Sequence, residues 1–383
     1  TDDSPATQKK DNVNKVVIED GITSIGDYAF DSCSNLASIE IPSGVTSIGI
    51  GAFQNCSSLT DITIPESVTS IGDYAFFGCR GLTSITIPES VTNIEGFAFY
   101  YCTGLTSVNI PESVTSIGGS AFSGCTGLTS INIPEGVTSI GASAFSGCTN
   151  LTDITIPDSV KSIGASAFYN CTGLTSIEIP EGVTSIGGSA FSGTPWLTNK
   201  QKDKPLVIVN GILIDGTACS GEVTIPDGVT SIGNDAFYEC TGLTSIEIPE
   251  GVTSIGDFAF SDCTSLTSIE IPRSVTSIGI GVFDNCGKLP EITVSCDSTL
   301  TKDAFGDASE KVKYRHSLVK TAAKDATYTE AGNVEYWTCE NCKKYFLSDE
   351  TDAEAAKEVE LSATVKPVPV QVATATTQIK CVY

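Results

Sequence analysis

The chain has 383 residues, with 46 acidic and 21 basic side chains and a formal net charge of −25. Such an acidic surface repels phosphate backbones, so we expect no nucleic-acid partner. No apolar run approaches the roughly 20 residues of a membrane-spanning helix, so we expect no membrane insertion.

The first fifteen residues are polar and predict a disordered lead-in, residues 1–15. The sequence does not begin with Met and contains none. We therefore expect a mature or trimmed product from which a signal peptide has been removed.

Residues 16–311 are built from a 23-residue repeat, best represented by residues 111–133. A period of this length is typical of a solenoid. The repeat is marked by phenylalanines spaced 23 residues apart: Phe30, Phe53, Phe76, Phe99, Phe122, Phe145, Phe168 and Phe191. After an irregular stretch the series resumes at Phe237, Phe260 and Phe283, and Phe305 closes it, which predicts about twelve coils.

Each repeat predicts one coil of strand, turn, strand and short helical turn. Residues 128–133, LTSINI, have the β-branched composition of a short strand that Pro134 ends. Residues 137–140, VTSI, predict a second extended piece, and residues 142–148 have room for about one helical turn. Because one coil buries too little apolar surface to offset its ordering entropy, the coils must stack and pair their strands in parallel.

The pattern IPxxVTSIGxxAFxxCxxLTxI, which recurs from residue 16 to about 308, resembles the BspA-like leucine-rich repeats of bacterial surface proteins. The resemblance implies a curved solenoid with a parallel β-sheet. It also implies secretion or display at the cell surface and adhesion to host or bacterial surfaces.

Stacking places two sets of polar residues in rows. Acidic residues follow the repeat proline, and they predict either a solvated edge that keeps the rod soluble or a surface that attracts cations or a basic partner. This acidic row comprises Glu66, Glu89, Glu112, Glu135, Asp158 and Glu181. A second column lies between inward-facing isoleucines on the predicted sheet face, where solenoids commonly bind partners. The candidate binding residues there are Thr63, Thr86, Asn109, Asn132, Thr155 and Glu178.

Residues 194–224 break the repeat. Phe191 and Phe237 are 46 residues apart, twice the period, so we expect this segment to replace about one coil. VIVNGILI predicts a hairpin about Asn210–Gly211. The basic cluster Lys200, Lys202 and Lys204 indicates a mobile loop or, alternatively, a local contact site.

Residues 312–383 predict a small β-rich domain. They carry 9 basic and 10 acidic side chains, so nearly all of the net charge lies before them. YRHSLVK, NVEYWTC and KYFLS are expected to form strands. The segment is similar, over residues 314–365, to a small accessory module of surface proteins from Gram-positive gut bacteria.

The chain has 15 cysteines, and two sets of them form recognisable patterns. Ten lie three residues after a repeat phenylalanine and predict a ladder of buried thiols; Thr194 fills this position in one repeat. Cys339 and Cys342 form a CxxC, and with His316 they offer three of four zinc ligands. Cys381 or Cys296 could supply the fourth, while a local disulfide or unpaired thiols are the alternatives.

We find no candidate catalytic residue: the chain has one histidine and no nucleophile elbow or phosphate-binding glycine motif. We therefore predict a non-catalytic protein, and we expect a monomer. The resemblance implies that it is extracellular or displayed at the cell surface. It would bind a protein or glycan of a host or bacterial surface through the sheet face. The alternative is a passive spacer that projects another domain.

Overall fold

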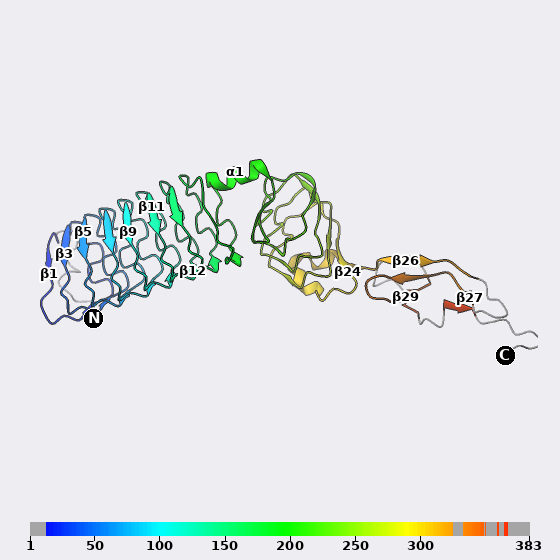
Figure 1. Cartoon of the computed structure of the whole chain (residues 1–383), viewed down its shortest axis with the longest axis horizontal. Coiled ribbons are helices and arrows are strands. Elements are labelled where there is room, and N and C mark those ends of the chain that lie inside the picture. Colours follow the sequence, from blue (N-terminus) through cyan, green and yellow to red (C-terminus); the bar gives the residue numbers. More distant parts are fainter. Residues whose placement is uncertain (1–12, 325–331, 348, 350–357, 360–363, 367–383) are drawn as a thin grey trace, which may run out of the picture.

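A computed structural model describes residues 13–324, 332–347, 349, 358–359 and 364–366. The predicted lead-in, apart from its last residues, lies outside this range, as does Cys381. The repeats form a row of stacked coils, and the C-terminal strands extend from its far end (Figure 1). No helix among the described residues is long and apolar enough to cross a membrane.

One row of parallel strands comes from the LTxI segments, and residues 312–315 add its last strand. We call this row the first ladder; its strands lie in four separate hydrogen-bonded sheets of two to five strands. Its register is in step with the repeat, so that Ile131 pairs with Ile154 and Asn132 with Thr155. The strands are β1 (Val16–Val17), β3 (Ser38–Glu40), β5 (Asp61–Thr63), β7 (Ser84–Thr86), β9 (Ser107–Asn109), β11 (Ser130–Asn132), β13 (Asp153–Thr155), β18 (Gly221–Thr224), β20 (Leu243–Glu247), β22 (Ser268–Ile271), β24 (Ile292–Ser295) and β25 (Val312–Arg315).

The VTSI segments form a second parallel ladder along the other edge of the coils, as β11 and β12 show in Figure 1. Its strands are β2 (Ser24–Ile25), β4 (Ser47–Ile48), β6 (Ser70–Ile71), β8 (Asn93–Ile94), β10 (Ser116–Ile117), β12 (Ser139–Ile140), β14 (Ser162–Ile163), β15 (Ser185–Ile186), β17 (Ile212–Asp215), β19 (Ser231–Ile232), β21 (Ser254–Ile255) and β23 (Ser277–Ile278). These strands are two residues long except β17. A glycine follows each two-residue strand except β8, which Glu95 follows.

The second ladder is interrupted between β6 and β8 and again between β15 and β17. At the first of these places Glu95 occupies the position that holds Gly72 and Gly118 in the neighbouring coils. A Cβ atom added to Gly118 would lie 2.7 Å from the backbone carbon of Glu95, which shows how closely the coils approach here. The side chain of Glu95 therefore holds these two coils slightly apart.

The segment expected to hold about one helical turn consists of successive tight turns. Amide groups alternate between bonds inside the coil and bonds to the next coil: Ala121 N donates to Gly118 O at 3.3 Å, whereas Phe122 N donates to Ala144 O at 2.8 Å. Ser120, at φ 55°, starts this alternation and prevents a continuous helix. These turns add a third set of hydrogen bonds that joins neighbouring coils.

The core is a stack of identical side chains. The ring of Phe122 lies 5.3 Å from Phe99 and 5.6 Å from Phe145, measured between centroids, with nearly parallel planes. The stack runs from Phe30 to Phe191 and again from Phe237 to Phe305. The other apolar positions of the repeat, such as Val114 and Leu128, are also buried, as the sequence predicts.

The predicted ladder of buried thiols is present. The ten repeat cysteines are buried, and each from Cys56 to Cys171 donates its S–H group to the carbonyl of the phenylalanine 26 residues earlier, at 3.1 Å. Cys263 and Cys286 make the same bond after the irregular segment. The thiols thus connect coils without forming disulfides.

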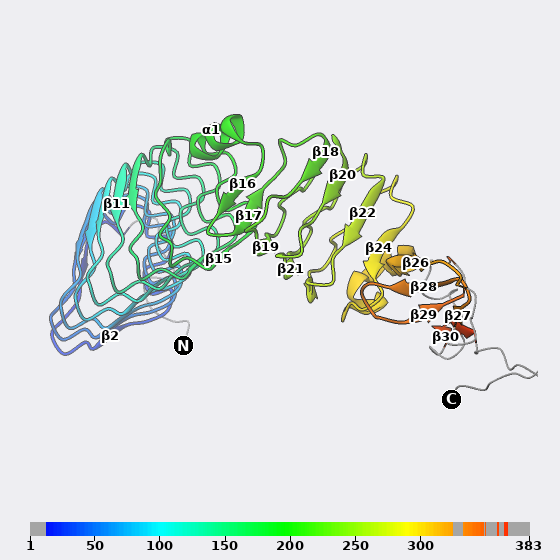
Figure 2. The ribbon, with the colours of Figure 1, turned by 45° about the vertical axis from the view of Figure 1, so that its right-hand side comes forward.

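Helix α1 (Pro195–Asp203) and the antiparallel pair β16 (Val207–Val209) and β17 fill the irregular segment. The hairpin about Asn210–Gly211 is confirmed, but the interpretation of residues 200–204 as a mobile loop was wrong. Thr194 caps the helix by accepting a bond from Leu197 N at 3.1 Å, and Pro195 follows at the first helical turn. The phenylalanine stack and both rows of strands are interrupted at this segment, and the coils on its two sides follow one arch (Figure 2).

The solenoid ends with a 3-10 segment, η3 (Lys302–Lys311), whose Phe305 covers Phe283 at 6.4 Å between centroids. Strand β25, just past the expected domain boundary at residue 311, still pairs in parallel with β24. The C-terminal strands then form an antiparallel sheet of β26 (Leu318–Thr321), β28 (Tyr336–Cys339), β29 (Tyr345–Phe346) and β30 (Glu358–Val359), beside a small pair of β27 (Gly332–Asn333) and β31 (Val365–Lys366).

Candidate functional site

The predicted binding column lies on the first ladder. All six of its residues, Thr63, Thr86, Asn109, Asn132, Thr155 and Glu178, are exposed. The first five end strands β5, β7, β9, β11 and β13, and direct register pairs join Thr86 to Asn109 and Asn132 to Thr155. Glu178 follows in the next coil, which has no assigned strand. We call this set the polar column.

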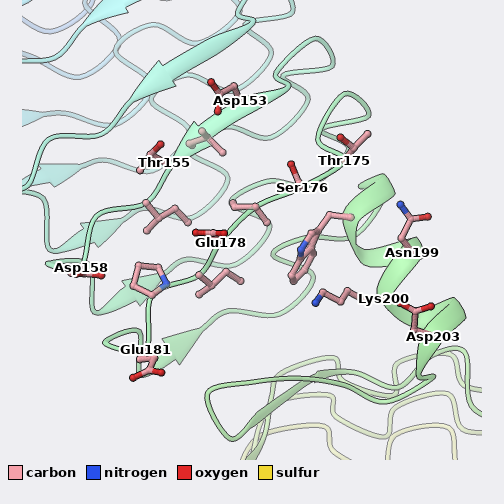
Figure 3. Close-up of a pocket in the computed structure, with 16 residues that line it drawn as sticks. Asp153, Thr155, Asp158, Thr175, Ser176, Glu178, Glu181, Asn199, Lys200 and Asp203 are labelled. Atoms are coloured by element: carbon pink, nitrogen blue, oxygen red, sulfur yellow. The ribbon is translucent and has the colours of Figure 1, made fainter.

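The polar column ends at a hollow beside α1. A cavity of about 780 Å³ is bounded by Thr155, Glu178 and their neighbours on one side and by Trp196, Lys200 and Asp203 on the other. Figure 3 shows Asn199 and Lys200 extending from the helix, with Asp153, Thr155 and Glu181 across the opening. We call this hollow the α1 groove.

The α1 groove is polar and acidic. Five carboxylates line it, from Asp153, Asp158, Glu178, Glu181 and Asp203, together with the hydroxyls of Thr155, Thr175 and Ser176. Lys200 supplies one cation, and its Nζ lies 6.0 Å from the ring centroid of Trp196. The lining therefore offers many hydrogen-bond acceptors with a positive group at the rim.

The sequence indicated one wall of this groove and missed the other. The polar column predicted Thr155 and Glu178, but residues 195–203 were not recognised as helical, because only Trp196 and Leu197 of that helix are buried. The signal that could have located α1 was the Thr-Pro start, a common helix beginning.

The acidic row is exposed along its whole length, at Glu66, Glu89, Glu112, Glu135, Asp158 and Glu181. It lies three residues past the polar column in every coil. Asp158 and Glu181 also line the α1 groove, so the row and the column meet there.

A cluster of aromatic side chains, missed by sequence reasoning, lies on the turn side of two neighbouring coils. Tyr74 stacks on Phe97 at 4.8 Å and Phe77 on Tyr100 at 5.0 Å, while Tyr101 meets Tyr100 edge-on at 4.6 Å. Tyr74 and Phe97 occupy, at φ 59° and 57°, a position that Ser120 and Ser143 hold in later coils. Bulky residues rarely adopt this conformation. The replacement of the repeat serine by Tyr74 and Phe97 was therefore the sequence signal that could have located the cluster.

The structure brings the predicted metal ligands His316, Cys339 and Cys342 together and adds Cys296. The ligand atoms of all four lie within 4.8 Å of one another. The Sγ atoms of Cys296 and Cys339 are 3.5 Å apart, and Cys342 Sγ lies 3.5 Å from His316 Nδ1.

The surroundings of this cluster shift the pKa values of its members in different directions. Burial and the neighbouring thiols of Cys339 and Cys342 raise the pKa of Cys296 well above its ordinary value. Burial lowers the pKa of His316, which favours the neutral imidazole. Burial acts to raise the pKa of Cys339, but hydrogen bonds from the backbone N–H groups of Cys342 and Asn341 outweigh it and bring the pKa below its ordinary value. A neutral imidazole and a stabilised thiolate are the forms that bind transition metals.

Comparison with protein families identifies the repeat. The family model described as the BspA type leucine rich repeat region matches residues 5–114, 92–206 and 216–323, with six copies. The chain belongs to the BspA-type leucine-rich repeat family. This membership confirms the fold class expected from the 23-residue period. The BspA-type match ends before the CxxC of residues 339–342, which the family model does not cover.

Solved structures of leucine-rich repeat proteins are similar to this chain. A leucine-rich repeat protein from Bacteroides ovatus is 29% identical, with a TM-score of 0.49 over 75% of this chain and 79% of that chain. One from Eubacterium ventriosum is 27% identical, with a TM-score of 0.48 over 73% and 85%. A leucine rich cell surface protein from Faecalibacterium prausnitzii is 30% identical, with a TM-score of 0.41 over 79% and 88%. None of the curated proteins matches the sequence significantly.

Proposed function

We propose that this protein is a non-catalytic binding protein of the extracellular or cell-surface space, which contacts a protein or glycan partner along the polar column. The observation that carries this proposal is the column itself, a run of exposed polar side chains held at fixed spacing by the first ladder. Solenoid sheet faces of this kind serve as extended binding surfaces.

The α1 groove gives the column a defined end. Flat polar strips bind weakly, because each hydrogen bond must replace one to water. A concave site removes more of a ligand from water and fixes its orientation. We therefore assign the centre of the contact to the region between Asn132 and Lys200, where hydroxyl, amide and carboxylate groups surround the groove.

The aromatic cluster is a second surface for the same function. Tyr101 is 46% exposed, and its ring is held by Tyr100. Exposed, pre-ordered aromatic rings are enriched in interfaces, because they bury large areas at small entropic cost. The binding experiment therefore includes a separate variant of the aromatic cluster, Tyr101→Ala.

The test is binding of the full chain to arrays of host matrix proteins and glycans, at low and high salt. The first variant carries Asn109→Lys, Asn132→Lys and Thr155→Lys, which add three like charges to the polar column up to the α1 groove. We expect at least tenfold weaker binding, about 1.4 kcal/mol. The matched control carries Thr92→Lys, Thr115→Lys and Thr138→Lys, all exposed and next to the second ladder, and it should bind as the native chain does.

Three outcomes separate the alternatives. Binding that vanishes at high salt and survives the column substitutions assigns the contact to the acidic row. Binding that Tyr101→Ala abolishes and the column substitutions leave intact assigns it to the aromatic cluster. If the native chain binds nothing on the arrays, the spacer alternative replaces the proposal.

A further inference from the structure

Four potential metal ligands meet where the last coil of the solenoid touches the C-terminal sheet. Cys296 follows β24 and His316 follows β25, and these two strands are paired in parallel up to Ser295 and Arg315. The two residues therefore leave the same edge of the solenoid side by side. Cys339 ends β28, and Cys342 lies in the turn before β29.

The spacing of the ligand atoms fits a tetrahedral zinc site. With Zn–S bonds of about 2.3 Å, two tetrahedral sulfur ligands are about 3.8 Å apart. The Cys296 and Cys339 sulfurs lie 3.5 Å apart, and all four ligand atoms lie within 4.8 Å of one another. A disulfide would need about 2.05 Å between sulfurs, so no pair is joined in this arrangement.

The CxxC turn is shaped to present both sulfurs to one point. Cys339 N donates to Lys344 O and Lys343 N donates to Cys339 O, each at 3.0 Å, which closes a tight loop around the two cysteines. Lys343 takes the left-handed conformation at φ 62°, an uncommon state for a residue with a side chain. The tight loop that holds the two sulfurs together thus contains one residue in an energetically unfavourable backbone conformation.

Hydrogen bonds outside the four ligands fix this turn against the solenoid. Asn341 Nδ2 donates to Ser295 Oγ at 2.8 Å, and Glu340 N donates to Ser317 O at 2.8 Å. Each bond joins a residue next to a CxxC cysteine with a residue next to a solenoid ligand. Such outer contacts orient metal ligands in known sites.

The donor set selects the metal. Cys339 is fully buried and His316 is 8% exposed, whereas Cys296 and Cys342 are half-buried, so the site is partly shielded from water. Three sulfurs and one imidazole are soft to borderline ligands, which favour zinc over calcium or magnesium. Four protein ligands leave no open position, which is characteristic of structural rather than catalytic zinc.

We propose that Cys296, His316, Cys339 and Cys342 bind one structural zinc ion that fastens the C-terminal strands to the last coil of the solenoid. Cys296 and His316 come from the solenoid side, and the CxxC comes from the C-terminal sheet. The ion acts as a cross-link between the two.

The first experiment measures zinc in the full chain, purified under reducing conditions from zinc-supplemented cells and freed of loose metal. We expect one zinc per chain. Cobalt substituted into the site should give the intense visible bands of tetrahedral coordination and a sulfur-to-cobalt charge-transfer band. Cys296→Ser and Cys339→Ser should each weaken zinc binding at least about tenfold against a competing chelator, since even outer-shell changes cost about 10- to 100-fold.

The control variant is Cys381→Ser, which removes the other cysteine that the sequence offers as a fourth ligand and should leave zinc binding unchanged. The clamp is tested by limited proteolysis between the solenoid and the C-terminal sheet. We expect chelation to speed cleavage there several-fold, with the circular-dichroism spectrum of the solenoid preserved.

Four results would overturn the proposal. They are absence of zinc and of the cobalt bands, a Cys339–Cys342 disulfide in the reduced preparation, native zinc affinity in Cys296→Ser, and cleavage rates that do not respond to chelation. A variant that merely misfolds is recognised because it loses the circular-dichroism spectrum of the solenoid. In that case the proposal is tested on the native chain alone, by comparing its cleavage rate with and without chelator.

Discussion

The thiol of Cys125 donates a 3.1 Å hydrogen bond to the carbonyl oxygen of Phe99, one coil back and 26 residues earlier. The same carbonyl oxygen also accepts a hydrogen bond from the backbone N–H of Cys102 at 3.2 Å. The oxygen of Phe99 therefore accepts two hydrogen bonds, one from an amide and one from a thiol. The repeat cysteine is therefore both a small core residue and a link between coils. Burial of these thiols raises their pKa, which gives them a titration behaviour that can be measured.

We expect the stability of the protein to fall as pH rises above about 9. Burial raises the pKa of the Cys171 thiol to about 12 and that of Cys286 to about 11, against an ordinary value of 9.0. Between these values the unfolded chain loses protons that the folded chain keeps. The stabilisation is complete below pH 9.0 and is lost as pH rises toward 12, at up to about 1.4 kcal/mol per pH unit per thiol.

The measurement is a series of thermal melts across alkaline pH for the native chain and Cys171→Ala. The variant starts from a lower melting temperature, because it leaves a small cavity, but it should lose stability less steeply above pH 9. Equal slopes for the two chains would show that this thiol does not contribute.

Phe122→Ala should destabilise the solenoid by about 3–5 kcal/mol, because it removes a fully buried ring that contacts two others in the stack. Urea titration followed by circular dichroism measures the loss. Tyr169→Ala is the control: Tyr169 is 42% exposed, and its change should stay within about 0.5 kcal/mol. A Phe122→Ala variant as stable as this control would contradict the assigned core.

Gly164→Ala and Gly26→Ala test how closely the coils approach, since both glycines follow the Ser-Ile pair of the second ladder. A Cβ at Gly164 would lie 2.4 Å from Ala142 N, so the coils must shift, and we expect a loss of about 1–3 kcal/mol. Gly26 belongs to the first coil and has nothing within 4 Å of that position. Its alanine variant should melt within a degree or two of the native chain.

Thr194→Ala should destabilise helix α1 by about 1 kcal/mol. The Thr194 hydroxyl accepts from Leu197 N and donates to Phe191 O at 2.7 Å, and the side chain is 1% exposed. Hydrogen exchange of residues 195–203 measures the effect, and Thr194→Ser, which keeps both bonds, is the matched control. An unchanged rate of hydrogen exchange in Thr194→Ala would show that the Thr194 side chain does not stabilise α1.

The repeat part of the fold was predictable because one 23-residue pattern fixes it many times over. Each inward position, such as Val114, Phe122 and Leu128, is buried as the pattern requires. The helical turn after Gly118 was less predictable, because alternate amides bond to the next coil. Such bonds depend on stacking, which local propensity does not contain.

Helix α1 and the Cys296 ligand were the parts of the site that sequence reasoning did not fix. The buried residues of α1 are too few to give a periodic apolar signal. Cys296 and Cys381 were equally possible partners for the CxxC, and only the pairing of β24 with β25 places Cys296 beside His316. Contacts between residues far apart in sequence decide both cases, and a single sequence does not record them.

The constant register of the coils also bears on how such a protein changes over generations. Ser116 pairs with Ser139, and Ser139 pairs with Ser162 in the same register. An in-frame duplication of one repeat in the gene would therefore add a coil that can pair in this register with the coils on both of its sides. A deletion would likewise rejoin matching surfaces. The reach of the molecule can therefore lengthen or shorten by single units between generations, while the irregular coil and the metal-binding end stay intact.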